Sequence, residues 1–165
     1  MRFAPHTCTH VTESLGGGVL TSILSITEAQ SKVGISTKLL YLERPDSPDY
    51  ENLKTIFAST KVIRVGKSNL WGFIKLYFSS FKLLSNKKSH QIIHVHSTVA
   101  GAILRFPNLI FRKPIHYTPH CYAFIRQDIN RLTRLFYKQI EKFLSTLTPT
   151  IVRSEEHTSE LQSRQ

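Results

Sequence analysis

Three consecutive glycines, Gly16, Gly17 and Gly18, stand between a β-branched segment, 9–12, and a segment with apolar residues at helical spacing, 20–33. Glycine has no Cβ, so such a turn can adopt positive φ and bring backbone N–H groups close to a ligand. A following helix directs the positive end of its dipole to the same place. The turn therefore favours a phosphate or pyrophosphate guest, with a glycine turn that only connects two elements as the alternative.

Polar side chains also follow two later strand-like segments. His96 and Ser97 come at the end of one of them, and His120 and Tyr122 come after the next. Imidazole titrates near neutral pH, so His120 is a candidate proton relay or hydrogen-bond donor to a substrate hydroxyl or phosphate. The alternative for a histidine beside a proline is a loop residue with a satisfied hydrogen bond.

Metal binding and cysteine catalysis are weaker interpretations of the same segments. His94 and His96 share one strand face and His116 lies on the next strand, but no carboxylate stands at a matching spacing. The sequence therefore predicts no metal site. Cys121 beside His120 resembles a nucleophile–base pair, yet adjacent residues rarely face each other productively.

The elements that would position these residues alternate along the chain. Turn and capping residues indicate strands over 9–12, 36–42, 61–65, 91–96, 114–118 and 150–152, and helices over 20–33, 48–57, 69–84, about 98–107 and 125–144. We expect Ser47 and Ser68 to cap the second and third helices, and the fourth helix to end near Pro107.

Strict alternation without hairpin signals predicts the fold class. It is typical of an α/β protein with a single Rossmann-like, doubly wound parallel sheet, here one domain over residues 1–152. Carboxyl ends of parallel strands lie at one edge, where ligands bind. We therefore expect the loops carrying Gly16–Gly18, His96–Ser97 and His120 to meet around one site.

Two helical segments carry faces with competing interpretations. In segment 70–84 the apolar and aromatic residues fall on one side, which we expect to pack on the sheet; attachment to an anionic membrane is the alternative. Segment 125–144 carries a basic stripe, a solvated face by default, that would also suit anionic lipid.

The composition limits the class of protein and its partners. The 165 residues include 22 Lys+Arg against 11 Asp+Glu, a formal net charge of +11, so acidic partners are expected: phosphorylated substrates, anionic lipid or nucleic acid. Two cysteines give no disulfide framework, and the sequence holds neither a membrane-span pattern nor a signal-peptide core. We expect a cytoplasmic protein, peripheral at the inner face of the cell membrane if the basic surface binds lipid.

The last residues read differently from the rest. Residues 153–163 resemble, residue for residue, the conceptual translation of a widely used short-read sequencing adapter. We therefore predict that 153–165 is a non-native tail and that the natural sequence continues differently after Val152.

Four motifs in order resemble one family. All four are similar to segments of family-4, GT-B-fold retaining glycosyltransferases. They are the glycine loop Glu13–Val19, Ile92–Ser97 followed by Ala100-Gly101, His116–His120 with Phe124, and Tyr137–Leu144 with Glu141. Among these glycosyltransferases the combination most resembles capsule, exopolysaccharide or O-antigen sugar transferases.

The resemblance implies two Rossmann-like domains with catalysis between them, of which this chain would be the amino-terminal, acceptor-side half. It implies a nucleotide-sugar donor as co-substrate and no other cofactor, with a lipid-linked or polysaccharide acceptor. By position, His120 matches the active-site histidine, and Gly16–Gly18, His96, Ser97 and Tyr122 match positions near donor diphosphate or substrate. The carboxyl-terminal domain with its Glu-x7-Glu signature is absent, so the fragment alone should be inactive.

Two other functions fit parts of the sequence. Gly16-x-Gly18 and Glu43 suit an NAD-dependent oxidoreductase, but Thr21 stands where the fingerprint needs a third glycine. The net charge suits a non-enzymatic nucleic-acid binder, but no nucleic-acid motif appears and the basic residues are scattered, so we expect no nucleic acid among the partners.

Overall fold

A computed structural model describes residues 7–86, 91–120, 130–146 and 150–151. They form a six-stranded, all-parallel sheet in the order β3-β2-β1-β4-β5-β6. The strands are β1 (Thr7–Thr12), β2 (Ser36–Glu43), β3 (Thr60–Lys67), β4 (Gln91–His96), β5 (Ile115–Thr118) and β6 (Thr150–Ile151). The helices are α1 (Gly17–Lys32), α2 (Tyr50–Ile56), α3 (Leu70–Ser85), α4 (Thr98–Phe111) and α5 (Arg131–Ser145). The Rossmann-like α/β prediction is confirmed.

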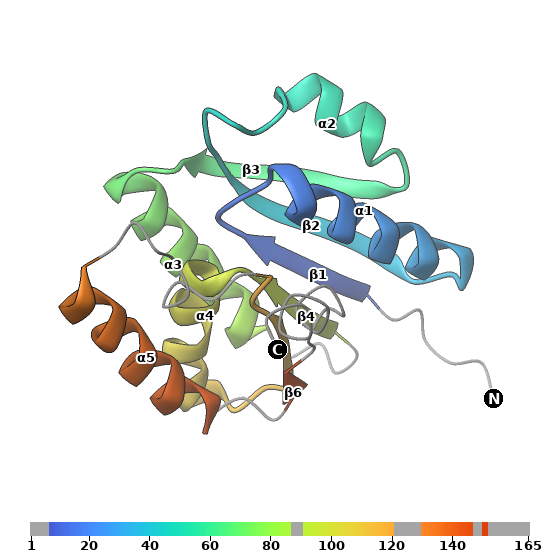
Figure 1. Cartoon of the computed structure of the whole chain (residues 1–165). Helices are drawn as coiled ribbons and strands as arrows, with labels where there is room; N and C mark the ends of the chain where they lie inside the picture. The colour runs from blue at the N-terminus through green and yellow to red at the C-terminus, as the bar shows by residue number, and fades with distance from the viewer. Residues whose placement is uncertain (1–6, 87–90, 121–129, 147–149, 152–165) are drawn as a thin grey trace, which may run out of the picture.

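Helices cover both faces of the sheet (Figure 1). On one face α1 and α2 close a core of buried residues: Leu15, Ile23, Leu39, Tyr41, Leu53, Phe57 and Val62. On the other face α3 and α4 close a second core, which includes Val11, Leu76, Val95, Leu104 and Tyr117. Alternate residues of the central strands point to opposite faces, so each of these strands contributes to both layers.

Asparagine and aspartate side chains cap three of the helices. Asp49 accepts a hydrogen bond from Asn52 N at the start of α2, and Asn69 accepts one from Gly72 N at the start of α3. The prediction of Ser47 and Ser68 as caps is therefore wrong. Ser47 instead accepts the Arg44 N–H in the preceding turn. Asn130 caps α5, which begins at Arg131; the predicted start at 125 lies outside the described residues.

The fourth helix does not end near Pro107, as predicted. α4 continues to Phe111, although the proline removes one backbone donor from its interior. The turn beyond it is held by Asn108, whose side chain donates to Lys113 O and accepts from Lys113 N. Arg112 closes the helix in the left-handed region, with φ of 51° and its N–H donated to Asn108 O.

The face of α3 that packs inward is not the aromatic one. Its buried residues are Gly72, Leu76, Ser80 and Leu84, whereas the aromatic residues Trp71, Tyr77, Phe78 and Phe81 are exposed. A Cβ at Gly72 would lie 1.7 Å from the Lys67 carbonyl oxygen, so the helix approaches the end of β3 where it has no side chain. The Ser80 hydroxyl is satisfied within the helix by Leu76 O. Small residues thus set the packed face, and the prediction of an aromatic core face is wrong.

A buried ion pair joins α4 to α5. The Arg105 guanidinium donates to both carboxylate oxygens of Glu141 at 2.8 and 3.0 Å, and through Nε to Gly101 O. Its Cζ lies 4.0 Å from the centre of the Tyr117 ring. Arg105 and Glu141 are almost fully buried, so the pair fixes the position of α5 over α4.

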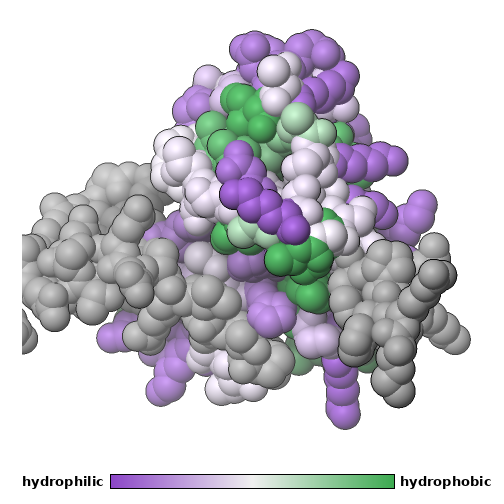
Figure 2. All heavy atoms as spheres, turned by 90° about the vertical axis from the view of Figure 1, so that its right-hand side faces the viewer, coloured by the Kyte–Doolittle hydropathy of each residue, from purple (hydrophilic) through white to green (hydrophobic). Residues whose placement is uncertain are grey.

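Large exposed apolar side chains gather on α3, α4 and α5, including Trp71, Phe78, Phe106, Ile110, Leu132 and Phe136. We call these side chains the aromatic surface. The face of the molecule in Figure 2, which lies on the right in Figure 1, differs: hydrophobic side chains there form small separate groups among hydrophilic ones. Within the described part of the chain, no helix combines the length and the apolar character needed to cross a bilayer.

Candidate active site

The loops that follow β1, β4 and β5 are tied together at the carboxyl edge of the sheet. Glu13, after β1, accepts hydrogen bonds from the Ser97 hydroxyl and from Ala100 N, the latter at 2.9 Å. Ser97 N donates to Thr118 O at 2.9 Å, which joins the end of β4 to the end of β5. β1 and β4 are neighbours at the point where the strand order reverses, the usual ligand position in such folds. The expected convergence of these loops is confirmed.

Glu13 is the main support of this junction. Its side chain is buried at 7% exposure, and burial raises the pKa of its carboxyl, while the bonds from Ser97 and Ala100 act in the opposite direction. Ser97 precedes α4 with φ of 72°, and its own side chain does not cap the helix. Glu13 therefore supplies the cap of α4 from another loop, placing an acceptor at the positive end of the helix dipole.

The glycine loop leaves the first turn of α1 without a side-chain cap. Gly16 occupies the cap position in extended conformation, Gly17 has φ of 51°, and Gly17 and Gly18 are exposed. The first turn carries no acidic side chain. These properties suit an anion-binding helix start, and the acidic side chain of Asp46, which lies near Gly16, is paired with Arg44. Binding of diphosphate or acceptor at Gly16, Gly17 and Gly18 stays a prediction.

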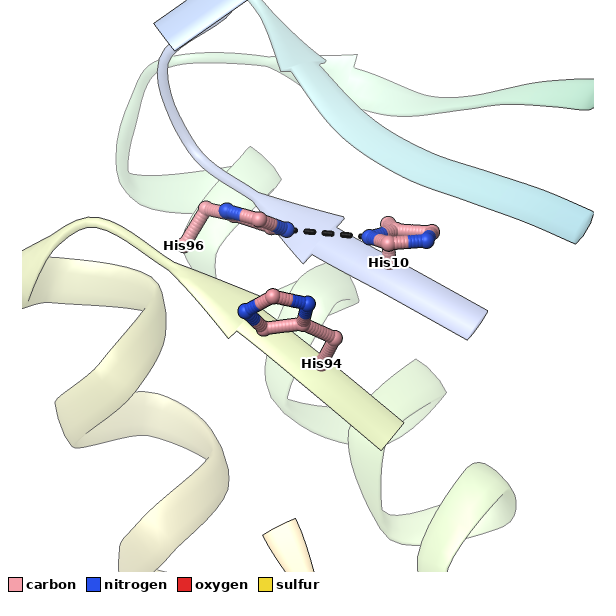
Figure 3. Close-up of side chains that lie close together, drawn as sticks. All are labelled: His10, His94 and His96. Atoms are coloured by element: carbon pink, nitrogen blue, oxygen red, sulfur yellow. Dashed lines mark hydrogen bonds between the residues drawn. The ribbon is translucent and has the colours of Figure 1, made fainter. Parts of the chain in front are cut away.

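Four histidines from neighbouring strands form a cluster on the α1 side of the sheet. His10 of β1 and His94 and His96 of β4 point to the same face, as Figure 3 shows. His10 Nδ1 lies 3.0 Å from His96 Nε2, and the His94 ring centre lies 4.1 Å from the His96 ring centre, with the two rings tilted by 33°. His116 of β5 is the fourth member, with its ring 6.3 Å from that of His94.

Burial keeps the inner histidines uncharged. It lowers the pKa of His10, lowers that of His94 to about 3, and lowers that of His96 well below its ordinary range. The neighbouring imidazoles act in the same direction on His94 and His96. A neutral imidazole carries one N–H and one lone pair, so each ring can donate at one nitrogen and accept at the other.

His10, His94 and His96 also satisfy the geometry of a metal site, since one nitrogen of each lies within 4.8 Å of the others. Both ring nitrogens of His10 and of His96, and Nε2 of His94, are however already engaged in hydrogen bonds. His10 bonds Gln30 and His96, His96 bonds His10 and His120, and His94 Nε2 bonds the Thr118 hydroxyl. An ion would have to break these bonds inside the protein. We therefore interpret the cluster as a hydrogen-bonded network.

His120 joins this network from the loop after β5. It is partly exposed, has φ of 56°, and its Nε2 lies 3.0 Å from His96 Nδ1. His96 is fully buried behind it, and Ser97 is engaged with Glu13 and the His96 carbonyl. Contact of His96 or Ser97 with substrate stays a prediction. Tyr122 and Cys121 lie outside the described residues.

Sequence reasoning missed three residues of this arrangement: His10, Gln30 and Glu13 as a cap. A signal for His10 existed, because it lies opposite His94 and on the same face wherever strands 1 and 4 are paired in this register. Gln30 had no such signal, since its place over β1 depends on how α1 packs.

A family model described as Glycosyltransferase Family 4 matches residues 16–165. The chain belongs to glycosyltransferase family 4. The match spans the glycine loop, the β4–α4 junction and His120, the same segments that carry the resemblance in sequence. This favours the transferase interpretation over the NAD-dependent one, in which Glu43 would bind a ribose; Glu43 is instead paired with Arg64 of β3 at 3.3 Å.

A relative at 32% identity over 148 residues is described as an uncharacterized 41.2 kDa protein in the cps region of Klebsiella pneumoniae. The match covers 87% of this family-4 chain and 38% of that protein. The chain thus spans well under half the length of the curated relative.

Solved structures share the fold at low identity. One is MurG from Acinetobacter baumannii, with a TM-score of 0.57 at 10% identity, covering 91% of this chain and 41% of that one. Another is the lipopolysaccharide outer core galactosyltransferase WaaB, with a TM-score of 0.54 at 15% identity, covering 79% of this chain and 37% of that one. A third, described as a putative UDP-N-acetylglucosamine 2-epimerase from Listeria monocytogenes, has a TM-score of 0.57 at 8% identity and covers 92% of this chain and 40% of that one. At these identities the likeness shows the fold alone, matching the amino-terminal halves of GT-B proteins.

Proposed function

We propose that this chain is the acceptor-side half of a glycosyltransferase that acts in cell-surface polysaccharide synthesis. Family membership carries the proposal. The relative from a cps region and the WaaB-like fold support the polysaccharide context. Coverage of about two fifths of each solved chain supports a second domain in the complete protein.

The proposed reaction takes a sugar from a nucleoside diphosphate to an acceptor hydroxyl with retention at the anomeric carbon. The bond from that carbon to the diphosphate breaks, a bond to the acceptor oxygen forms, and the hydroxyl proton passes to the departing diphosphate oxygen. The exposed start of α1 at Gly17 and Gly18 suits the negative charge of the diphosphate. His120, at the edge of the same loops, suits a hydrogen bond to the sugar or acceptor.

We further propose that the acceptor is lipid-linked and that the protein works at an anionic membrane surface. The aromatic surface combines exposed Trp71 and Phe78 with Lys75 on the same helix, and α5 adds the basic residues Arg131, Arg134, Lys138 and Lys142. Aromatic side chains suit the interfacial layer of a bilayer, and basic ones suit anionic headgroups.

The test is sugar transfer by the complete protein, expressed from the source locus with its sequence beyond Val152. Membranes of the same organism would supply the acceptor, and a panel of radiolabelled nucleoside diphosphate sugars the donor. We expect transfer from one donor, and a His120→Ala variant with a rate lower by about 100-fold or more.

The matched control is His116→Ala, which removes a histidine of β5 that lies beside His94 of β4 and leaves His120 in place. It should retain most of the activity. No transfer from any donor, or equal loss in both variants, would contradict the proposal.

A further inference from the structure

A continuous line of hydrogen bonds runs from α1 to His120. Gln30 Oε1 lies 2.8 Å from His10 Nε2, His10 Nδ1 lies 3.0 Å from His96 Nε2, and His96 Nδ1 lies 3.0 Å from His120 Nε2. It crosses β1 and β4 and ends in the loop after β5. We call these four residues the imidazole chain.

The bonds of the imidazole chain must all point the same way. His10 and His96 are fully buried and uncharged, so each has one N–H. A ring that donates at Nε2 has to accept at Nδ1, so the next ring must donate to it. The group at the inner end therefore determines which nitrogen of the outermost ring carries the proton.

Gln30 is that inner group. Its carbonyl oxygen faces His10 Nε2, so His10 donates there and accepts at Nδ1 from His96. His96 in turn accepts at Nδ1 from His120 Nε2. His120 then carries its proton on Nε2 and presents an unprotonated Nδ1. Cys8 Sγ, 3.5 Å from His10 Nε2, leaves this unchanged, because burial raises the pKa of the thiol to about 11 and the group stays neutral.

We propose that Gln30, His10 and His96 are positioning residues that hold His120 in the Nε2–H tautomer, with Nδ1 as the acceptor for a substrate hydroxyl. The assignment of a substrate to His120 rests on the proposed function; the assignment of the tautomer rests on the imidazole chain alone. His120 has a left-handed backbone at φ of 56°, which disfavours most side chains, and the bond to His96 helps to hold it there.

The direct test is nitrogen NMR of the 165-residue chain labelled with ¹⁵N-histidine, at neutral pH. Protonated and unprotonated ring nitrogens resonate far apart, and single His→Gln variants assign the signals. We expect His10, His96 and His120 all as Nε2–H tautomers. An Nδ1–H tautomer at His120 would overturn the proposal.

Two variants of Gln30 sharpen the test. Gln30→Glu keeps an acceptor at the inner end, so the tautomers should not change. Gln30→Lys replaces it with a group that only donates, so His10, His96 and His120 should switch to Nδ1–H. His116 is the internal reference, because it stands outside the imidazole chain and its signals should stay the same in every folded variant. Unaltered His120 signals in Gln30→Lys, with the His10 signals switched, would refute transmission along the chain.

The functional consequence is measured separately in the complete enzyme. Gln30→Lys should lower kcat by about tenfold, with a smaller change in KM for the donor, because His120 would offer an N–H in place of an acceptor. Gln30→Glu should retain kcat. If the tautomers switch as expected but the complete protein transfers no sugar, the proposed function fails while the imidazole chain stands. If the complete protein transfers sugar but the tautomers do not respond to the Gln30 variants, the imidazole chain fails while the proposed function stands.

Discussion

At the scale of single residues, the candidate site depends on buried polar side chains that serve one another. Glu13 holds the start of α4, His96 holds His120, and Gln30 orients His10. A buried polar group that loses its partner costs more than the bond itself contributed, so such a network tolerates substitution poorly. The residues in contact with any ligand are thus only the outer part of the arrangement.

Glu13→Ala should destabilise the chain by about 2 kcal/mol, because Ala100 N and the Ser97 hydroxyl would lose their acceptor in a buried position. Chemical denaturation measures the change. Glu51→Ala, which removes a solvent-exposed ion pair with Lys54, should change stability much less, because solvent screens the pair. Similar values for the two variants would contradict the capping role of Glu13.

Stability should fall as the pH drops below about 6.5. His10, His94 and His96 have lowered pKa values in the folded chain, that of His94 about 3, so below the ordinary histidine pKa the unfolded chain binds more protons. Each contributes up to about 1.4 kcal/mol per pH unit. The raised pKa of Glu13 acts in the opposite sense at lower pH.

Denaturation curves at several pH values measure this effect. His94→Asn should flatten the dependence between about pH 6.5 and 4.5. A wild-type chain whose stability does not change over this range would show that the inner histidines are protonated in the folded state.

At the scale of elements, the sequence predicted the strands well and the helix faces less well. β-branched runs bounded by turn residues placed each described strand within two residues of its position. The inward face of α3 was missed because the helix is apolar nearly all round, and packing selected the face with Gly72 and Ser80. α4 ran through Pro107 to Phe111, and the Asn108 side chain holds the turn after it through Lys113, a tertiary detail that the proline alone did not signal.

The pairing of β1 with β4 also lay beyond the sequence pattern, since alternation predicts a parallel sheet but not which strands are neighbours. His10 therefore went unnoticed, although His94 and His96 were recognised as sharing a face. The convergence of the three loops needed no such pairing, because all parallel strands end at one edge, and it was predictable.

Gly72→Ala should destabilise the chain strongly, by about 3 kcal/mol or more, because the new Cβ would overlap the Lys67 carbonyl oxygen at 1.7 Å. Gly18→Ala is the matched control: a Cβ there meets no atom within 4 Å, and alanine favours a helix. Thermal unfolding of both variants measures the difference. A mild effect at Gly72 would mean that α3 can move away from β3.

The ion pair between α4 and α5 makes a further prediction at this scale. Glu141→Gln should cost about 3 to 5 kcal/mol, because it leaves the buried Arg105 guanidinium without its counter-charge. Glu43→Gln removes the charge that pairs with Arg64. Because this ion pair is more exposed than that of Arg105 and Glu141, the change should cost less than about 1 kcal/mol. Equal effects in the two variants would contradict the structural role of the buried pair.

At the scale of the whole molecule, basic charge and exposed aromatic residues occur together. The net charge of +11 and the aromatic surface on α3, α4 and α5 both suit a partner that is anionic and apolar at once. A protein partner for the aromatic surface is the alternative.

Vesicle co-sedimentation separates the two partners. The chain should bind vesicles containing phosphatidylglycerol and not neutral ones, and a Trp71→Ser, Phe78→Ser variant should lose most of the binding. The control Val33→Ser, Ile56→Ser changes exposed apolar residues away from α3, α4 and α5 and should bind normally. Absence of binding to anionic vesicles would favour a protein partner.

The central proposal is that this chain is one half of a two-domain sugar transferase. Reading the source locus across the Val152 codon, with reads longer than the inserts, tests it most directly. We predict that the frame continues into a second α/β domain with a Glu-x7-Glu pair, in place of residues 153–165. A genomic tail identical to 153–165 and followed by a stop codon would contradict the claim, and the chain would then be a freestanding family-4 domain.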